Sequence, residues 1–181
     1  MTGTPDMRTL MQAYVAGTNR PTKHVDICLD PACARAWKDA DAELTDAKAA
    51  VDDEADETGG TIGAASAAKK RLTAATKAEK DARNRLAQSS IRLVFTGLTT
   101  TAWNGLITAL RTIDNDEERT IAEQSRLPQK CLTGATTVTG NDAGLTKEDL
   151  DRLLDNLPPA DVSRCWAAAL EACTETIDLP F

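Results

Sequence analysis

The longest regular pattern in the chain lies between residues 32 and 88, where Ala, Lys, Asp, Glu and Arg dominate and proline is absent. In its first half, apolar residues recur at alternating spacings of three and four, as in a heptad seam: Trp37, Ala40, Leu44, Ala47 and Val51. The same spacing resumes further on, at Ala65, Ala68, Leu72, Ala75, Glu79, Ala82 and Leu86. The pattern predicts two helices, over residues 32–56 and 62–88.

Two adjacent glycines, Gly59 and Gly60, separate the predicted helices and permit the chain to reverse. Each helix would be roughly 40 Å long, and neither seam is apolar enough to be stable alone. We therefore expect the helices to pair as an antiparallel hairpin that turns at Gly59 and Gly60, with the small alanines allowing close approach. An interrupted coiled coil that dimerises between chains is the alternative.

Strand-like alternation of apolar and polar residues flanks this helical region, at 25–29 before it and at 91–95 after it. If the helices fold back on one another, these two segments meet and run in opposite directions. We expect a two-stranded ribbon from which the helical hairpin projects. Because a lone two-stranded sheet is marginal in water, other elements must cover one of its faces.

The C-terminal third provides short amphipathic helices for that cover. A first helix, capped by a threonine at 99–101, places Trp103, Leu106, Ile107 and Leu110 on one face. We expect a polar helix over 115–124, a second short helix from Leu127 and Pro128 to Leu132, and a loop over 133–144. A helix that starts with Thr146 and Asp149 at capping-box spacing and ends before Pro158, and a last helix over 159–174, complete the series.

The predicted fold is therefore mainly α: an antiparallel helical (coiled-coil) hairpin inserted between two short β-strands, followed by a small C-terminal helical bundle. We divide the chain into an N-terminal segment 1–20 that is free to be flexible, a strand–hairpin–strand module 21–98, and a helical domain 99–181 packed on the strands.

Composition narrows the classes of function. The 181 residues carry a net charge of -7, and this acidity argues against binding to a nucleic-acid backbone. No apolar run approaches the roughly 20 residues of a membrane helix, and the start has no signal-peptide pattern, so we expect an intracellular protein without a membrane partner. The chain has one histidine, no GxSxG and no phosphate-binding glycine loop. We predict that it is not an enzyme and has no cofactor or catalytic residues.

Five cysteines form an odd set without a CxxC motif, and we interpret them as reduced thiols: Cys28, Cys33, Cys131, Cys165 and Cys173. Cys165 and Cys173 lie eight positions apart on one predicted helix, too far for a disulfide, and are expected to be small buried residues. His24, Cys28 and Cys33, with Asp26 and Asp30 between them, are the best set of metal-ligand atoms. Their spacing matches no zinc motif, so we predict no metal site.

The order of these features resembles the tail assembly chaperone proteins of long-tailed phages that infect actinobacteria. The resemblance starts near residue 21 and covers most of the chain. It rests on the residues of the two strand segments, on Ala102 to Leu106, on Leu127 to Leu132, and on the Leu-rich and Trp-bearing pair 145–157 and 162–166.

The resemblance implies a non-catalytic role in the host cytoplasm. Such a protein binds the long helical tape-measure protein during tail building, assists tail-tube subunits and is absent from the mature virion; self-association into a homo-oligomer is compatible with the coiled segment. A structural minor tail or head-tail connector component is the alternative. The candidate protein-binding residues are five seam positions that we expect to be exposed: Trp37, Leu44, Val51, Leu72 and Leu86.

Overall fold

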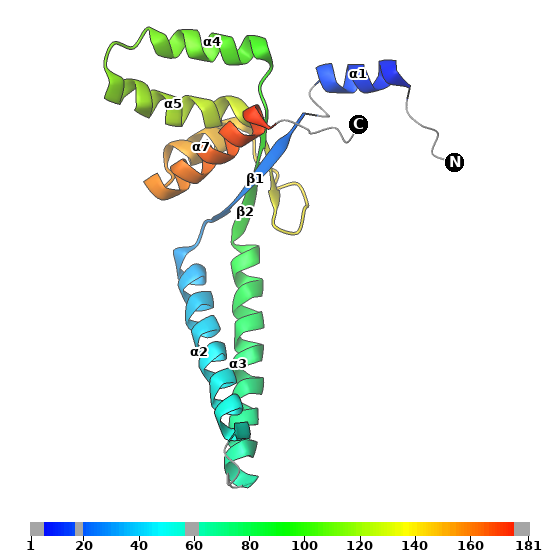
Figure 1. Cartoon of the computed structure of the whole chain (residues 1–181), viewed down its shortest axis with the longest axis vertical. Coiled ribbons are helices and arrows are strands. Elements are labelled where there is room, and N and C mark those ends of the chain that lie inside the picture. Colours follow the sequence, from blue (N-terminus) through cyan, green and yellow to red (C-terminus); the bar gives the residue numbers. More distant parts are fainter. Residues whose placement is uncertain (1–5, 17–19, 57–61, 176–181) are drawn as a thin grey trace. The chain divides into compact units, whose positions relative to one another are not determined.

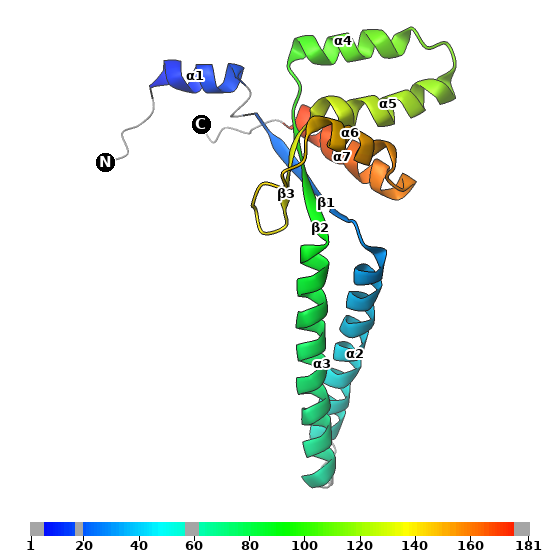
Figure 2. The ribbon, with the colours of Figure 1, turned by 180° about the vertical axis from the view of Figure 1, so that it is seen from behind.

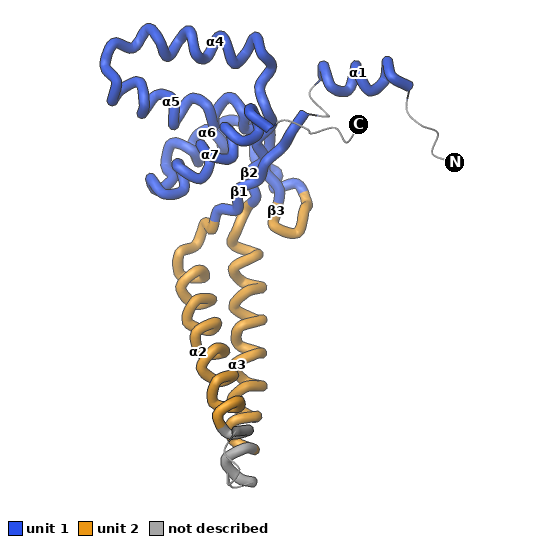
Figure 3. The backbone as a smooth tube through the Cα atoms, in the orientation of Figure 1, with its two compact units in different colours: residues 1–27, 92–136, 142–181 blue, residues 28–91, 137–141 orange. Residues whose placement is uncertain are grey.

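The computed structural model describes residues 6–16, 20–56 and 62–175. The chain is mainly α, with a helical hairpin and a three-stranded antiparallel sheet. It divides into two compact units, which Figure 3 distinguishes by colour. Unit 1 comprises residues 1–27, 92–136 and 142–181, and unit 2 comprises 28–91 and 137–141.

Unit 2 contains the helical hairpin, formed by α2 (Pro31–Asp56) and α3 (Ile62–Gln88), and both helices agree with the predicted ranges. They lie side by side in Figures 1 and 2. Two contacts show their antiparallel direction: Trp37 reaches Glu79, and Glu43, further along α2, reaches Arg71, earlier on α3. The predicted turn at Gly59 and Gly60 falls outside the described residues.

Small side chains form the centre of the hairpin seam. Ala47 of α2 and Ala68, Ala75 and Ala82 of α3 are buried, as the heptad spacing predicts. A charged residue is also buried in the seam: Glu79 is only 7% exposed. Its carboxylate accepts a hydrogen bond from Trp37 Nε1 at 3.2 Å and pairs with Arg83 at 2.8 Å, and these donors offset the cost of burying the charge.

The sheet has the order β1-β2-β3, formed by β1 (Thr22–Cys28), β2 (Ser90–Thr96) and β3 (Leu132–Thr137). Figure 2 shows all three strands. The first two strands are antiparallel, because the Leu29 amide donates to the Ser89 carbonyl at one end of the pair and the Gly97 amide donates to the Pro21 carbonyl at the other. Both predicted strands are confirmed: the segment predicted at 25–29 lies at Thr22–Cys28, and the segment predicted at 91–95 extends over Ser90–Thr96.

The third strand corrects the expectation of a two-stranded ribbon and of a loop over 133–144. Alternate residues of β2 are buried and its backbone needs partners at both edges, so a second neighbour stabilises it. β3 supplies that neighbour by burying Leu132 and Ala135 and by donating a hydrogen bond from the Thr133 hydroxyl to the carbonyl of Val94 at 3.2 Å.

The described residues of unit 1 form five helices: α1 (Met7–Val15), α4 (Thr100–Arg111), α5 (Asp116–Cys131), α6 (Lys147–Asp155) and α7 (Pro159–Thr174). α5 packs against α4, α6 and α7. The predicted caps are confirmed, since Thr99 accepts a hydrogen bond from the Ala102 amide and Thr146 forms a capping box with Asp149.

α5 is one helix where the sequence predicted two. Pro128 lies inside it and removes one amide donor, which usually interrupts a helix. Here Leu127, Pro128 and Cys131 are all buried, so the gain from packing this turn outweighs the missing hydrogen bond.

The sheet and α7 approach each other closely at the end of β2. Gly97 follows the strand directly and is buried, and its amide donates to the carbonyl of Pro21 at 3.0 Å. A Cβ atom built on Gly97 would lie 2.3 Å from the carbonyl oxygen of Ala172 on α7. The largest fully buried side chains of this unit include Leu93 and Phe95 of β2, and Leu106, Leu127, Cys131 and Cys165 of the helices. None of the helices in the described ranges has the length and apolar character needed to cross a membrane.

Candidate protein-binding site

Helix α1 carries the most exposed apolar surface among the described residues. Its large apolar side chains lie at i, i+3, i+4, i+7 and i+8, which places them along one face of the helix. They are 77%, 38%, 61%, 59% and 69% exposed in the order Met7, Leu10, Met11, Tyr14 and Val15. We call this set the α1 stripe.

The local sequence accounts for the helix itself. The Asp6 side chain caps its first turn by accepting a hydrogen bond from the Arg8 amide, and the Ala16 amide closes the last turn on the Gln12 carbonyl. The helix buries none of its nine residues, and only Ala13 is half-buried. Isolated helices shorter than about 12 residues are marginally stable in water, so a partner that covers the α1 stripe would stabilise this helix.

The side chains of the α1 stripe suit a contact surface for protein. Met is flexible and adapts its shape to different apolar partners, and Tyr combines a large apolar ring with a polar end. A row of apolar residues at these spacings is the arrangement that amphipathic helices use when they dock on another helix or in an apolar groove. Tyr14 and Val15 also border a cavity of about 300 Å³, whose lining includes Gly97 and Ala172.

The five residues that the sequence singled out lie elsewhere, on the hairpin of unit 2. Trp37, Leu44, Val51, Leu72 and Leu86 are all half-buried, which corrects the expectation that they are exposed. The structure places them on the two helices of the seam, and the Trp37 indole is already engaged with Glu79. A partner can reach only part of each side chain while the hairpin is closed.

The set His24, Cys28 and Cys33 is not brought together as a metal site. His24 is exposed on β1. Cys28 Sγ instead donates to the Asp30 carbonyl at 3.0 Å, and Cys33 Sγ donates to the Asp30 carboxylate at 3.3 Å. Across the described ranges, no three His, Cys, Asp or Glu side chains are grouped closely enough to hold a metal ion.

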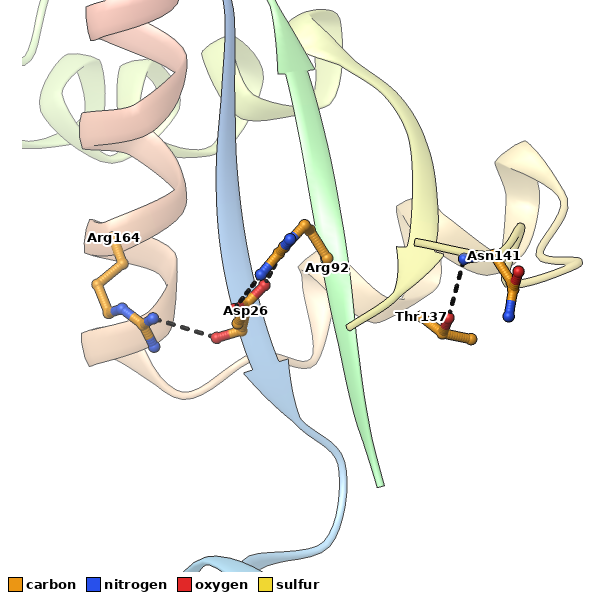
Figure 4. A network of polar contacts seen from close by, with 5 residues as sticks. All are labelled: Asp26, Arg92, Thr137, Asn141 and Arg164. Carbon is orange, nitrogen blue, oxygen red and sulfur yellow. Dashed lines mark hydrogen bonds and ion pairs between the residues drawn. The ribbon is translucent and has the colours of Figure 1, made fainter. Parts of the chain in front are cut away.

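A polar network on unit 1 joins the sheet to α7. Arg92 Nε and Nη2 bind the two oxygens of the Asp26 carboxylate at 2.7 and 2.9 Å, and Arg164 Nη2 donates to the Asp26 carbonyl at 3.1 Å (Figure 4). The hydrogen bonds from Arg92 lower the pKa of Asp26, against a smaller opposing effect of burial. The network holds β1 and α7 in place, and a partly exposed pair of this kind is typical of structural contacts.

Two further polar features lie in the turn after β3 and on α7. In the turn, the Asn141 amide donates to the Thr137 hydroxyl at 3.1 Å, also drawn in Figure 4. On α7, the buried indole nitrogen of Trp166 has no hydrogen-bond partner among the described residues. Neither feature supplies a nucleophile, base or ligand set.

Sequence reasoning missed the α1 stripe, although its signal was present. The i, i+3, i+4, i+7, i+8 spacing from Met7 to Val15 is visible in the sequence, but the prediction treated residues 1–20 as a segment that can be flexible and assigned no helix there. Exposure of the stripe is a tertiary property, since the same spacing usually marks a face that packs on the core.

Comparison with known proteins adds no relative: no family model, curated protein or solved structure gives a significant match to the chain.

Proposed function

We propose that this protein is a non-enzymatic tail assembly chaperone, which binds the tape-measure protein of a long-tailed phage in the host cytoplasm and leaves before the virion is complete. The observation that carries the proposal is the α1 stripe, a row of five exposed apolar side chains on a helix that buries none of its residues. The order of sequence elements that resembles this class of chaperone supports it.

The chemistry of the two partners is complementary. A tape-measure protein is long and helical, and its apolar faces need cover before the tail tube encloses it. The α1 stripe offers an apolar helical face of matching character, and Met7 and Met11 allow it to fit a series of similar sites along one partner. The net charge of -7 keeps the chaperone soluble while this face is unoccupied.

The binding test uses two adjacent substitutions that add the same charge to the same helix. Met11→Glu places a carboxylate within the stripe, whereas Gln12→Glu places one beside it on an exposed polar position. Full-length variants are co-expressed with the tape-measure protein, and the complex is quantified after affinity purification. Burying a charge in an apolar contact and losing the Met side chain should weaken binding more than about tenfold for Met11→Glu. Gln12→Glu should stay within about twofold of wild type.

Three results would count against the proposal. Failure of the wild-type chain to bind the tape-measure protein rejects the chaperone role. Equal binding by Met11→Glu and wild type rejects the α1 stripe; loss of binding by Trp37→Ala and Leu44→Ala in folded protein would then place the contact on the hairpin. Detection of the protein in purified particles by mass spectrometry favours the alternative, a structural minor tail or head-tail connector component.

A further inference from the structure

Two cysteines that are distant in sequence lie in contact in unit 1. Cys131 is the last residue of α5 and Cys173 lies in the last turn of α7, 42 positions further on, and their Sγ atoms are 3.6 Å apart. A disulfide bond is about 2.05 Å long, so the two sulfurs need to approach by roughly 1.5 Å to form one. We call Cys131 and Cys173 the dithiol pair.

The two thiols of the pair have different environments. Cys131 is fully buried, and its neighbour together with burial raises its pKa, so it stays protonated. Cys173 is half-buried and its sulfur accepts a hydrogen bond from the Leu98 amide at 3.4 Å; in its contact with Cys131 either thiol can be the donor. The contact with the Cys131 sulfur and the Leu98 amide lower the pKa of Cys173, against an opposing effect of burial. Loss of a proton from the pair is therefore favoured at Cys173, the member that receives the Leu98 amide.

Cys173 is also the member of the pair that small molecules can reach, because Cys131 is fully buried. Cys173 borders two cavities, one of about 300 Å³ shared with Gly97 and Leu98, and one of about 260 Å³ shared with Trp103. Either volume exceeds that of a hydroperoxide many times, since a water molecule occupies about 30 Å³ in the liquid. Access and a thiolate are the two conditions for reaction with peroxide.

The remaining cysteines have different neighbours. Cys165 is buried on the same helix as Cys173, and burial raises its pKa to about 11, so its sulfur stays protonated. The Cys28 and Cys33 thiols donate hydrogen bonds to the carbonyl and the carboxylate of Asp30, and neither is hydrogen-bonded to another thiol. These three cysteines provide internal controls for the reactivity of the pair.

We propose that the dithiol pair is a redox modification site, at which a hydroperoxide converts the two thiols into a reversible disulfide. The Cys173 thiolate attacks one oxygen of hydrogen peroxide; an S–O bond forms, the O–O bond breaks, and the departing hydroxide takes a proton to become water. The Cys131 sulfur then attacks the sulfenic acid, the S–S bond forms, and a second water leaves with the proton of the Cys131 thiol. Two thiols are oxidised and one peroxide is reduced to two waters.

The first experiment uses the full-length wild-type chain, so no variant has to fold. One molar equivalent of hydrogen peroxide is added, the reaction is quenched at intervals with N-ethylmaleimide, and each cysteine is followed by peptide mass spectrometry. We expect Cys131 and Cys173 to escape alkylation together, at least about tenfold faster than Cys28 or Cys33, as a cross-linked peptide from a monomer. Dithiothreitol should restore both thiols.

Two variants sharpen the assignment. In Cys131→Ser, Cys173 has no resolving thiol and should be trapped by dimedone as a sulfenic acid. Cys165→Ser should form the cross-link at the wild-type rate. The proposal is overturned if the pair reacts no faster than Cys28 and Cys33, if Cys173 cross-links between chains while Cys131 stays free, or if the dimedone adduct in Cys131→Ser appears on Cys165 instead of Cys173.

Discussion

Gly97 provides the sharpest quantitative test of how the sheet packs on α7. An alanine there adds one methyl group, and its Cβ would lie 2.3 Å from the carbonyl oxygen of Ala172. Ordinary contacts of a Cβ atom begin near 3.4 Å, so the two segments must separate by about 1 Å. The obstructing atom belongs to backbone, and Gly97 is tied to Pro21 by its own amide, so neither side can yield through a side-chain rotation.

The expected cost follows from these contacts. Overpacking a well-packed interior by one methyl group costs typically about 1–3 kcal/mol, and a backbone obstruction belongs in the upper part of that range. Replacing glycine stiffens the unfolded chain and returns about 0.4–1 kcal/mol. The net loss in the free energy of unfolding should be about 2 kcal/mol, close to a 30-fold fall in the folding constant.

Urea denaturation followed by circular dichroism measures this loss. With a slope of about 2 kcal/mol per molar urea, the midpoint of Gly97→Ala should fall by about 1 M. Gly105→Ala is the matched control: a Cβ at Gly105 meets nothing within 4 Å, and the residue lies inside α4. Alanine in a helix interior is favoured over glycine by up to about 1 kcal/mol, so this control should become more stable.

The two substitutions should change the free energy of unfolding in opposite directions. If Gly97→Ala unfolds at the wild-type midpoint or above it, the close approach of β2 and α7 is wrong. If both variants are destabilised alike, the effect of Gly97→Ala comes from a general sensitivity to added methyl groups and not from the contact with Ala172.

Three further outcomes follow from other contacts. Trp37→Phe removes the indole donor to buried Glu79 and should lower the free energy of unfolding by about 1 kcal/mol, because Arg83 still pairs with the carboxylate. The lowered pKa of Asp26 stabilises the fold above its unfolded value of 3.8, and this contribution is lost as the pH falls through the folded pKa. The stability lost in Asp26→Asn should therefore be below about 1 kcal/mol near neutral pH and vanish in acid. Oxidation of the dithiol pair closes a 42-residue loop and should stabilise the chain by at most about 4 kcal/mol.

Each of these outcomes has a measurement and a contradicting result. Thermal melts of Trp37→Phe are compared with Trp103→Phe on α4, and equal shifts would contradict the role of the Glu79 contact. Urea titrations at a series of pH values follow Asp26→Asn, and a deficit that grows in acid would mean that the Asp26 carboxylate destabilises the fold. The oxidised wild-type chain is unfolded in urea without reductant and the reduced chain with reductant. Equal midpoints would show that the cross-link does not stabilise the fold by lowering the entropy of the unfolded chain.

The helical hairpin was the most predictable part of the fold. Its seam repeats along two long helices, of 26 and 27 residues, with no proline between Ala32 and Gln88, so many weak signals agree on the same period. β3 gave no such signal, because Leu132 and Ala135 are its only buried apolar residues and Gly134 interrupts them. Its pairing with β2 arises from tertiary structure, as does the continuity of α5 through Pro128.

The functional surfaces were harder to predict than the fold. The helical spacing of the apolar residues in α1 can be read from the sequence, but spacing alone does not show whether other parts of the protein cover that face of the helix. The dithiol pair depends on how α5 and α7 end beside each other, and sequence spacing excluded only a bond between Cys165 and Cys173. Candidate contacts on the seam were assigned from apolar character, which the hairpin itself uses for its own packing.

The connection between β1 and β2 has a consequence for how this chain can change over evolutionary time. The strand ends are joined through two antiparallel helices, so equal numbers of residues can be gained or lost from both helices while the sheet keeps its register. Insertions of whole heptads would preserve the seam and lengthen only the hairpin. The length of the hairpin is thereby independent of the sheet, and related chains are free to differ in reach while sharing one core.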